Sequence, residues 1–178
     1  MLQKCSILKV AEVFFNEPTK EHYLIEISRK AKIAHTSVKN HLETLKRQGV
    51  IKETAEKKGE RDFPLYKADT ENKEYTLYKK TDNFIRLKTS GLVGYLKDSL
   101  MPSVIIVFGS YARGEDTEDS DIDIFVMCKE EPLRLEKFEK LLNRKIQLHF
   151  KKDLKDYPPE LKNNIINGTV LDGYLEVF

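Results

Sequence analysis

Apolar side chains recur every three or four positions in three segments of the first fifty residues, a spacing that places them on one face of a helix. These segments are residues 4–15, 24–31 and 35–48. Thr36 is expected to cap the third helix with its hydroxyl, and Gly49 is expected to end it, because glycine readily adopts the left-handed conformation that follows a helix. The pattern therefore predicts three short helices, each with one buried face.

Two strand-like pieces follow, at residues 50–56 and 62–68, and the polar residues 57–61 between them are typical of a hairpin tip. Three helices followed by a two-stranded hairpin is the element order of a winged helix-turn-helix. The phrase SVKNHLETLKRQGVIKE also resembles that of many winged-helix regulators. This resemblance implies either a DNA-binding domain or a module for protein docking or dimerisation.

If this domain binds DNA, residues 35–48 are its recognition helix and the hairpin tip reaches neighbouring phosphates. The residues that we expect to meet DNA are Thr36, Ser37, Lys39, Asn40 and Arg47 on the helix, and Lys57, Lys58 and Arg61 at the tip. The alternative is a solvated helix face, because Glu43 and Lys46 lie close to the same surface.

The second half of the chain alternates strands and helices. Residues 104–108, VIIVF, form a continuous apolar run, which is typical of a strand buried on both faces. The other expected elements are a polar loop at 109–120, strands at 121–127 and 145–150, a helix at 132–143 with Pro132 near its first turn, and a last helix that ends near Gly168. The fold class is therefore α/β or α+β, with a winged helix-turn-helix followed by a small mixed sheet.

A long helical stretch, residues 71–100, joins the two halves, and Gly91 and Gly94 predict a bend or a split within it. We predict a winged-helix domain at 1–69, a helical connector at 70–99 and a second domain at 100–178.

Charge divides the chain in a similar place. Residues 1–100 hold 20 Lys and Arg against 14 Asp and Glu, a balance of +6, whereas residues 101–178 hold 11 against 15, a balance of −4. A basic part beside an acidic part indicates two domains with different partners, and one candidate pair is a polyanion for the first and a metal ion for the second.

Composition excludes several classes of protein. With 34% charged and 40% hydrophobic residues over 178 positions, the chain is typical of a globular protein rather than a disordered one. Its longest uncharged apolar stretch, residues 103–109, is far shorter than the ~20 residues that a membrane helix needs. Charged residues interrupt the apolar run from Ile7 to Phe15, and Cys5 and Cys128 show no metal-ligand spacing and form no disulfide framework. We therefore expect a cytoplasmic protein with no membrane partner.

The residues that most clearly indicate chemistry lie within FGSYARGEDTEDSDIDIFV, residues 108–126. Asp121 and Asp123 are two apart on a predicted strand, so both project from the same face. Neighbouring carboxylates repel unless a cation bridges them, and Mg²⁺ held by carboxylates and substrate phosphates meets that need. Upstream, Gly109 lets a phosphate approach the backbone, and Ser110 offers a hydroxyl and an N–H. The pattern predicts a joint phosphate and metal site.

Gly109-Ser110, ten residues and then Asp121-x-Asp123 resembles the signature of the DNA polymerase beta-like nucleotidyltransferases, and YARGE and SDID look like their minimal single-domain branch. The similarity covers about residues 100–174 and implies a nucleotidyltransferase domain. It also implies that Asp121 and Asp123 hold two Mg²⁺ ions and that the serine turn grips the triphosphate of an NTP. The implied reaction moves a nucleoside monophosphate to a hydroxyl and releases pyrophosphate.

The loop between these motifs is polar. Arg113 is either a phosphate contact or only a loop cation. We expect the acidic residues that follow it to be solvated rather than metal ligands; they are Glu115, Asp116, Glu118 and Asp119.

One departure from the family bears on catalysis. Active members carry a third carboxylate on a neighbouring strand, which binds metal and deprotonates the attacking hydroxyl. The matching strand here reads KIQLHF, and its polar positions by alternation are Gln147 and His149. Gln147 cannot act as a base, whereas His149 can, since imidazole titrates near neutral pH. Asp153 is the nearest carboxylate downstream.

Two hypotheses follow. The first is a Mg²⁺-dependent nucleotidyltransferase, targeted by a winged-helix domain, that modifies a protein or small-molecule hydroxyl. The second is a winged-helix DNA-binding regulator, or an antitoxin-like protein with a toxin partner, whose second domain senses nucleotide without turnover. A homodimer is expected in either case, because a winged-helix domain and a long connecting helix favour one.

Overall fold

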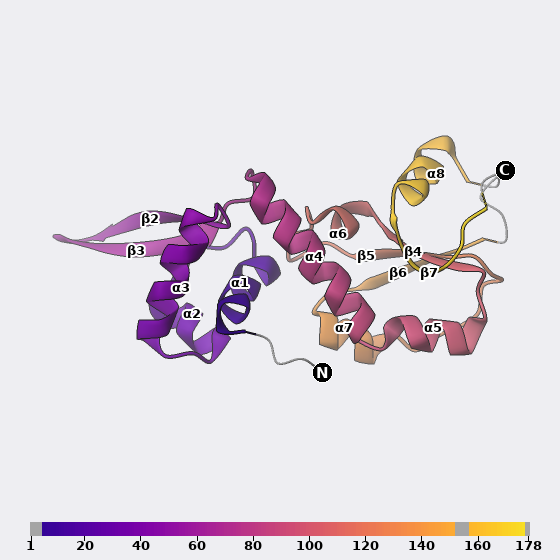
Figure 1. Ribbon diagram of the computed structural model, residues 1–178, viewed down its shortest axis with the longest axis horizontal. Coiled ribbons are helices and arrows are strands. Elements are labelled where there is room, and N and C mark those ends of the chain that lie inside the picture. The colour runs from indigo at the N-terminus through magenta and orange to yellow at the C-terminus, as the bar shows by residue number, and fades with distance from the viewer. Residues whose placement is uncertain (1–4, 152–156, 177–178) are drawn as a thin grey trace. The chain divides into compact units, whose positions relative to one another are not determined.

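The computed structural model describes residues 5–151 and 157–176, with the side chain of Lys58 excepted. It divides into two compact units, Met1–Lys79 and Lys80–Phe178. Figure 1 labels the helices of both and every strand except β1. Within the described residues, no helix combines the length and the apolar character that crossing a bilayer requires.

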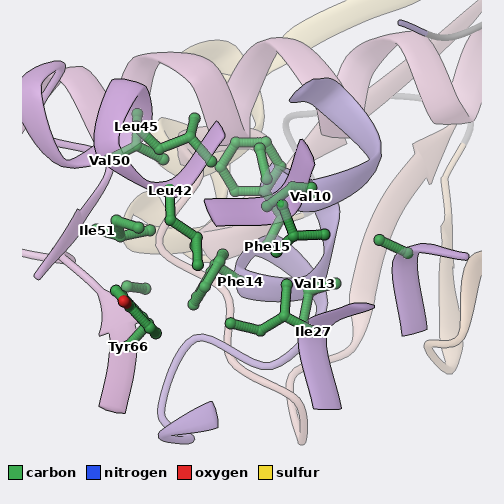
Figure 2. Packing of buried hydrophobic residues seen from close by; sticks show 14 of the residues in the cluster. Val10, Val13, Phe14, Phe15, Ile27, Leu42, Leu45, Val50, Ile51 and Tyr66 are labelled. Carbon is green, nitrogen blue, oxygen red and sulfur yellow. The ribbon is translucent and has the colours of Figure 1, made fainter. Parts of the chain in front are cut away.

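The first unit is a winged helix-turn-helix. Its elements are α1 (Ser6–Asn16), β1 (His22–Tyr23), α2 (Leu24–Ala31), α3 (His35–Arg47), β2 (Ile51–Lys58) and β3 (Arg61–Ala68). The three strands form an antiparallel sheet in the order β1-β3-β2. The sequence did not predict β1, because a strand of two residues is too short to show an alternating hydrophobic pattern. The core combines one face of each helix with the base of the hairpin, as Figure 2 shows for Phe14, Ile27, Leu42 and Ile51.

Two local expectations in this unit are wrong. Thr36 does not cap α3, because Ala34 occupies the cap position with extended backbone and no side-chain cap bond. Lys32, at φ 56°, turns the chain early, and the N–H of Val38 already donates to the carbonyl of Ala34. The hairpin tip is also shorter than residues 57–61, because β2 and β3 pair as far as Lys58 and Arg61.

The helical stretch after the hairpin is split, as predicted. It forms α4 (Lys73–Thr89) and α5 (Leu92–Leu100), with Gly91 between them at φ 82°. Gly94 lies inside α5 and does not interrupt it.

The second unit is a four-stranded mixed sheet with helices on both faces. Its remaining elements are β4 (Val104–Phe108), α6 (Gly109–Arg113), β5 (Ile122–Val126), α7 (Glu136–Leu142), β6 (Ile146–Phe150), α8 (Pro159–Ile166) and β7 (Thr169–Gly173). The strand order is β6-β5-β4-β7, in which β5 and β6 are parallel and the other pairs antiparallel.

Central strand β4 is buried on both faces, as its apolar run predicts. Ile105 and Val107 pack in a cluster with residues of α5 and α7, whereas Ile106 and Phe108 pack in a second cluster with Ile165 of α8. All five residues of β4 are buried. The candidate site lies at the end of this buried strand.

Two expectations in this unit are corrected. The segment at 109–120 is not wholly loop, because α6 occupies its first five residues. Helix α7 begins at Glu136, and Pro132 lies outside it, because the first helical N–H groups to find an acceptor, those of Phe138 and Glu139, bond to the carbonyl of Leu135.

Candidate active site

Gly109 stands where β4 gives way to α6. Phe108 is still extended at φ −137°, and Gly109 turns to φ 73°, a region that side chains disfavour. A Cβ at position 109 would lie 2.6 Å from Oδ2 of Asp123, well inside van der Waals contact. Glycine is therefore required here twice, by its backbone conformation and by the carboxylate that lies against it.

The two aspartates lie at the start of β5, beside this turn. Phe108 and Asp123 are directly paired across β4 and β5. Ile122 and Ile124 point into the core that α5 and α7 cover, as the alternation predicts, so Asp123 lies on the opposite face. Asp121 is exposed and Asp123 is half-buried. The Gly109 turn and the two carboxylates therefore lie at the same end of the two inner strands, β4 and β5.

Strand β6 brings an imidazole to the same carboxylate. Because β6 is parallel to β5, Gln147 pairs with Asp123, and His149 lies two residues further along the same face. Nε2 of His149 is 3.2 Å from Oδ1 of Asp123, and its ring packs edge-on against Phe108 with centroids 5.1 Å apart. Gln147 is exposed. Asp153 lies outside the described residues.

The donor set suits a hard cation that carries part of its own coordination shell. Asp121 and Asp123 supply carboxylate oxygens, the ligands that Mg²⁺ prefers, and Mg²⁺ usually retains waters and takes substrate phosphates besides one or two carboxylates. Among the described residues, no group of three or more His, Cys, Asp and Glu side chains is arranged to hold a metal alone. A cation held by Asp121 and Asp123 would therefore take further ligands from water or from a substrate phosphate.

The other polar residues of the segment have separate environments. Nε of Arg113 donates to Oε2 of Glu115 at 2.7 Å, and both side chains are about half exposed. Ser110 is part-buried in the first turn of α6.

The expectation of a solvated acidic loop is wrong for Asp116, which is only 2% exposed. It accepts hydrogen bonds from Asn83 and Arg144. Nothing in the sequence separates Asp116 from the neighbouring acids, because these partners lie 33 and 28 positions away.

In the first unit, the predicted DNA contacts of α3 lie on one exposed face of that helix. The helix buries Val38, Leu42 and Leu45, which leaves the predicted residues in solvent: Thr36, Ser37, Lys39, Asn40 and Arg47. Lys57 and Arg61 of the hairpin are exposed, and the side chain of Lys58 lies outside the description. Lys46 instead bonds to Glu53 at 2.6 Å and to Glu43, and these bonds raise its pKa.

Comparison with known proteins matches the second unit to a family. Residues 90–172 match the model named nucleotidyltransferase domain. A Methanocaldococcus jannaschii protein named "Putative protein adenylyltransferase MJ1379" is 45% identical over 78 residues, which cover 39% of this chain and 76% of that protein. The "Protein adenylyltransferase MntA" of Thermococcus cleftensis is 47% identical over 55 residues, which cover 28% of this chain and 56% of that protein.

Among solved structures, a mutant form of ZitR from Lactococcus lactis is 21% identical to this chain with a TM-score of 0.40. The match covers 55% of this chain and 68% of that one. The winged-helix assignment depends instead on the order and pairing of the elements described above.

Proposed function

The chain belongs to the nucleotidyltransferase domain family, and on that premise we propose that it transfers a nucleoside monophosphate from an NTP to a hydroxyl group. The names of the two relatives support ATP as the donor and a protein hydroxyl as the acceptor. A small-molecule hydroxyl remains the other acceptor class that the same chemistry serves.

The observation that carries this proposal is the contact of Gly109 with Asp123. It joins the turn that would hold the triphosphate to the carboxylates that would hold its metal. Gly109 leaves the backbone open to a phosphate, and Ser110 offers it a hydroxyl and an N–H. Asp121 and Asp123 would hold Mg²⁺, which supplies charge stabilisation at the attacking and leaving oxygens when bound.

His149 has a distinct role in this proposal. Its contact with Asp123 orients that carboxylate, and its position on β6 corresponds to the strand from which other members supply a third carboxylate. Arg113 is a further candidate for a phosphate contact. To make that contact, its side chain would have to leave Glu115 and bind the phosphate instead.

The test is transfer of label from α-labelled ATP, with Mg²⁺ or Mn²⁺, to the protein itself and to components of a lysate from the source organism. Asp121→Asn and Asp123→Asn are expected to abolish transfer. Asp119→Asn is the matched control, since Asp119 is an exposed acid two positions before the pair. Equal transfer by all four proteins would overturn the assignment of the site.

A second candidate function has an observation of its own. In the described part of β6, the residue paired with Asp123 is Gln147 and not an acid. This favours a DNA-binding regulator, or an antitoxin-like protein with a toxin partner, in which the second unit binds nucleotide without transferring it. The exposed polar face of α3 supports the DNA-binding part of this proposal.

Calorimetry and a gel shift distinguish the two. Heat from ATP and Mg²⁺ that is lost in Asp121→Asn, together with no label transfer, would support the regulator. Retention of duplex DNA that weakens steeply with salt is then expected, because phosphate contacts release counterions. Transfer of label at a measurable rate would favour the enzyme instead.

A further inference from the structure

A carboxylate is buried inside the loop that joins the Gly109 turn to the paired aspartates. Asp116 is 2% exposed, whereas its neighbours Glu115 and Asp119 lie in solvent. Burial of a carboxylate is unfavourable unless it is paired and hydrogen-bonded, so Asp116 has partners that compensate it.

Those partners bind both oxygens of the carboxylate. Nδ2 of Asn83 donates to Oδ1 at 2.8 Å, and Nη2 of Arg144 donates to Oδ2 at 3.3 Å. Arg144 is buried as deeply as Asp116, with side-chain exposures of 3% and 1%. Both groups of this pair are removed from water, so their hydrogen bonds come from protein partners.

The partners come from two separate parts of the second unit. Asn83 belongs to α4, and its Nδ2 also donates to the carbonyl of Tyr111 in α6 at 2.9 Å. Arg144 lies in the turn between α7 and β6, where Nη1 donates to the carbonyl of Asn143. Asn83 thus holds α6 and the loop together, and Arg144 holds the loop to the start of β6.

The same turn is also tied to the metal side of the site. The residue after Arg144, Lys145, accepts at its carbonyl the N–H of Ile122, which lies between the two candidate metal ligands, at 2.8 Å. On the other side, the N–H of Glu115 donates to the carbonyl of Ser110 at 3.0 Å. Asp116 therefore lies in the chain between the phosphate turn and the paired aspartates, and its partners Asn83 and Arg144 belong to the segments that contact the two ends of this loop.

We propose that Asp116 is the positioning residue of the nucleotide site, which it shapes through Asn83 and Arg144 without touching the nucleotide. This proposal rests on the proposed function of the same site. It predicts that the buried pair sets the spacing between Ser110 and Asp121, and with it the affinity for a nucleotide and its metal.

The test compares full-length Asp116→Asn with the wild type. The amide keeps the size of the side chain but presents an NH₂ donor to either Asn83 or Arg144, both of which are donors. We expect the affinity for ATP with Mg²⁺ to fall roughly tenfold, as for other residues that orient a metal-binding side chain without touching the metal. Calorimetry measures it at a temperature where all proteins are folded. Asp172→Asn is the matched control, since Asp172 forms a surface pair with Lys97 in the same unit.

A second variant and the unfolding midpoint separate positioning from a merely structural role. Asn83→Ala removes the two hydrogen bonds that Nδ2 donates, to Asp116 and to the carbonyl of Tyr111, and keeps the buried pair of Asp116 with Arg144. It should lower the affinity about threefold, and it is the variant to use if Asp116→Asn fails to fold. A lower unfolding midpoint with unchanged ATP affinity in Asp116→Asn would overturn the proposal.

A measurement without nucleotide keeps the two proposals distinct. Amide hydrogen exchange at Thr117 and Ile122 should accelerate in Asp116→Asn and not in Asp172→Asn. Failure of the wild type to bind ATP would overturn the proposed function. Unchanged exchange at both amides would overturn the positioning role, whatever the wild type binds.

Discussion

Nε2 of His149 lies 3.2 Å from Oδ1 of Asp123, although the two residues are 26 positions apart in the chain. The parallel pairing of β5 and β6 produces this contact, and Gly109 lies against the other oxygen of the same carboxylate. Asp123 thus has an imidazole at one carboxylate oxygen and the glycine turn beside the other.

This arrangement predicts that His149→Ala weakens metal and nucleotide binding without unfolding the protein. Removal of a partner that orients a metal-binding carboxylate typically lowers affinity or activity about 10- to 100-fold. Calorimetric titration with Mn²⁺ in the presence of ATP measures this loss of affinity. His41→Ala, at a half-buried histidine that bonds to Ser6 in the first unit, is the control. Equal affinities for Mn²⁺ and ATP in the two variants would show that His149 does not contribute to binding at this site.

A second prediction concerns Gly109. Gly109→Ala should destabilise the protein by about 1–3 kcal/mol and abolish nucleotide binding, because the new Cβ would press on Asp123 at a backbone angle that alanine disfavours. Gly94→Ala, inside α5 with open space around it, should instead stabilise the protein by ~0.5–1 kcal/mol.

Gly91→Ala separates the two causes at Gly109. Gly91 has φ 82° but nothing within 4 Å of a built Cβ, so it carries the backbone strain without the clash. Urea unfolding of the three variants measures the effects. A loss of nucleotide binding in Gly91→Ala as large as in Gly109→Ala would contradict a specific role for the contact with Asp123.

A third prediction is that the free energy of unfolding of the first unit depends on pH. His22 is 1% exposed and packs edge-on against Phe14. Burial lowers its pKa below 6.5, and the charge of Lys30 adds to this effect, although Glu17 and Glu26 oppose it in part. Because the unfolded chain takes up the proton more readily, this contribution to stability is complete above about pH 6.5 and is lost as the pH falls below it.

Urea unfolding at pH 7.5 and pH 5.5 tests this. The loss due to His22 is at most about 1.4 kcal/mol at pH 5.5, one pH unit below its ordinary pKa. His22→Gln should remove that part of the pH dependence, whatever it does to stability at pH 7.5. An unchanged difference between the two pH values would show that His22 does not titrate in this way.

The exposed face of α3 leads to a fourth prediction. Lys39→Ala and Arg47→Ala should each weaken binding to duplex DNA and each reduce the slope of log affinity against log salt by about 1, as expected for a lost phosphate contact. Lys20→Ala is the control, since Lys20 is an exposed lysine outside the helix and the hairpin and pairs with Glu17. No retention of DNA by the wild type at low salt would exclude a DNA-binding role for this face.

The sequence by itself determined the local elements and the chemistry of the main motif. Helical spacing of apolar residues predicted α2 with its observed bounds, and the continuous apolar run predicted β4 equally well. Both predictions succeeded because the local spacing of apolar residues indicates which side chains are buried. The spacing of Asp121 and Asp123 also placed Ile122 and Ile124 in the core, since the side-chain period of a strand is two.

Tertiary structure alone decided which distant residues meet. His149 reaches Asp123 only because β6 lies parallel beside β5, and strand order is a property of the whole sheet. Asp116 looks like its solvated neighbours until α4 and the turn before β6 bury it. The start of α7 likewise depended on which carbonyl its first N–H groups could reach. Local periodicity specifies faces and elements, whereas long-range pairing determines which of those faces come together to form a site.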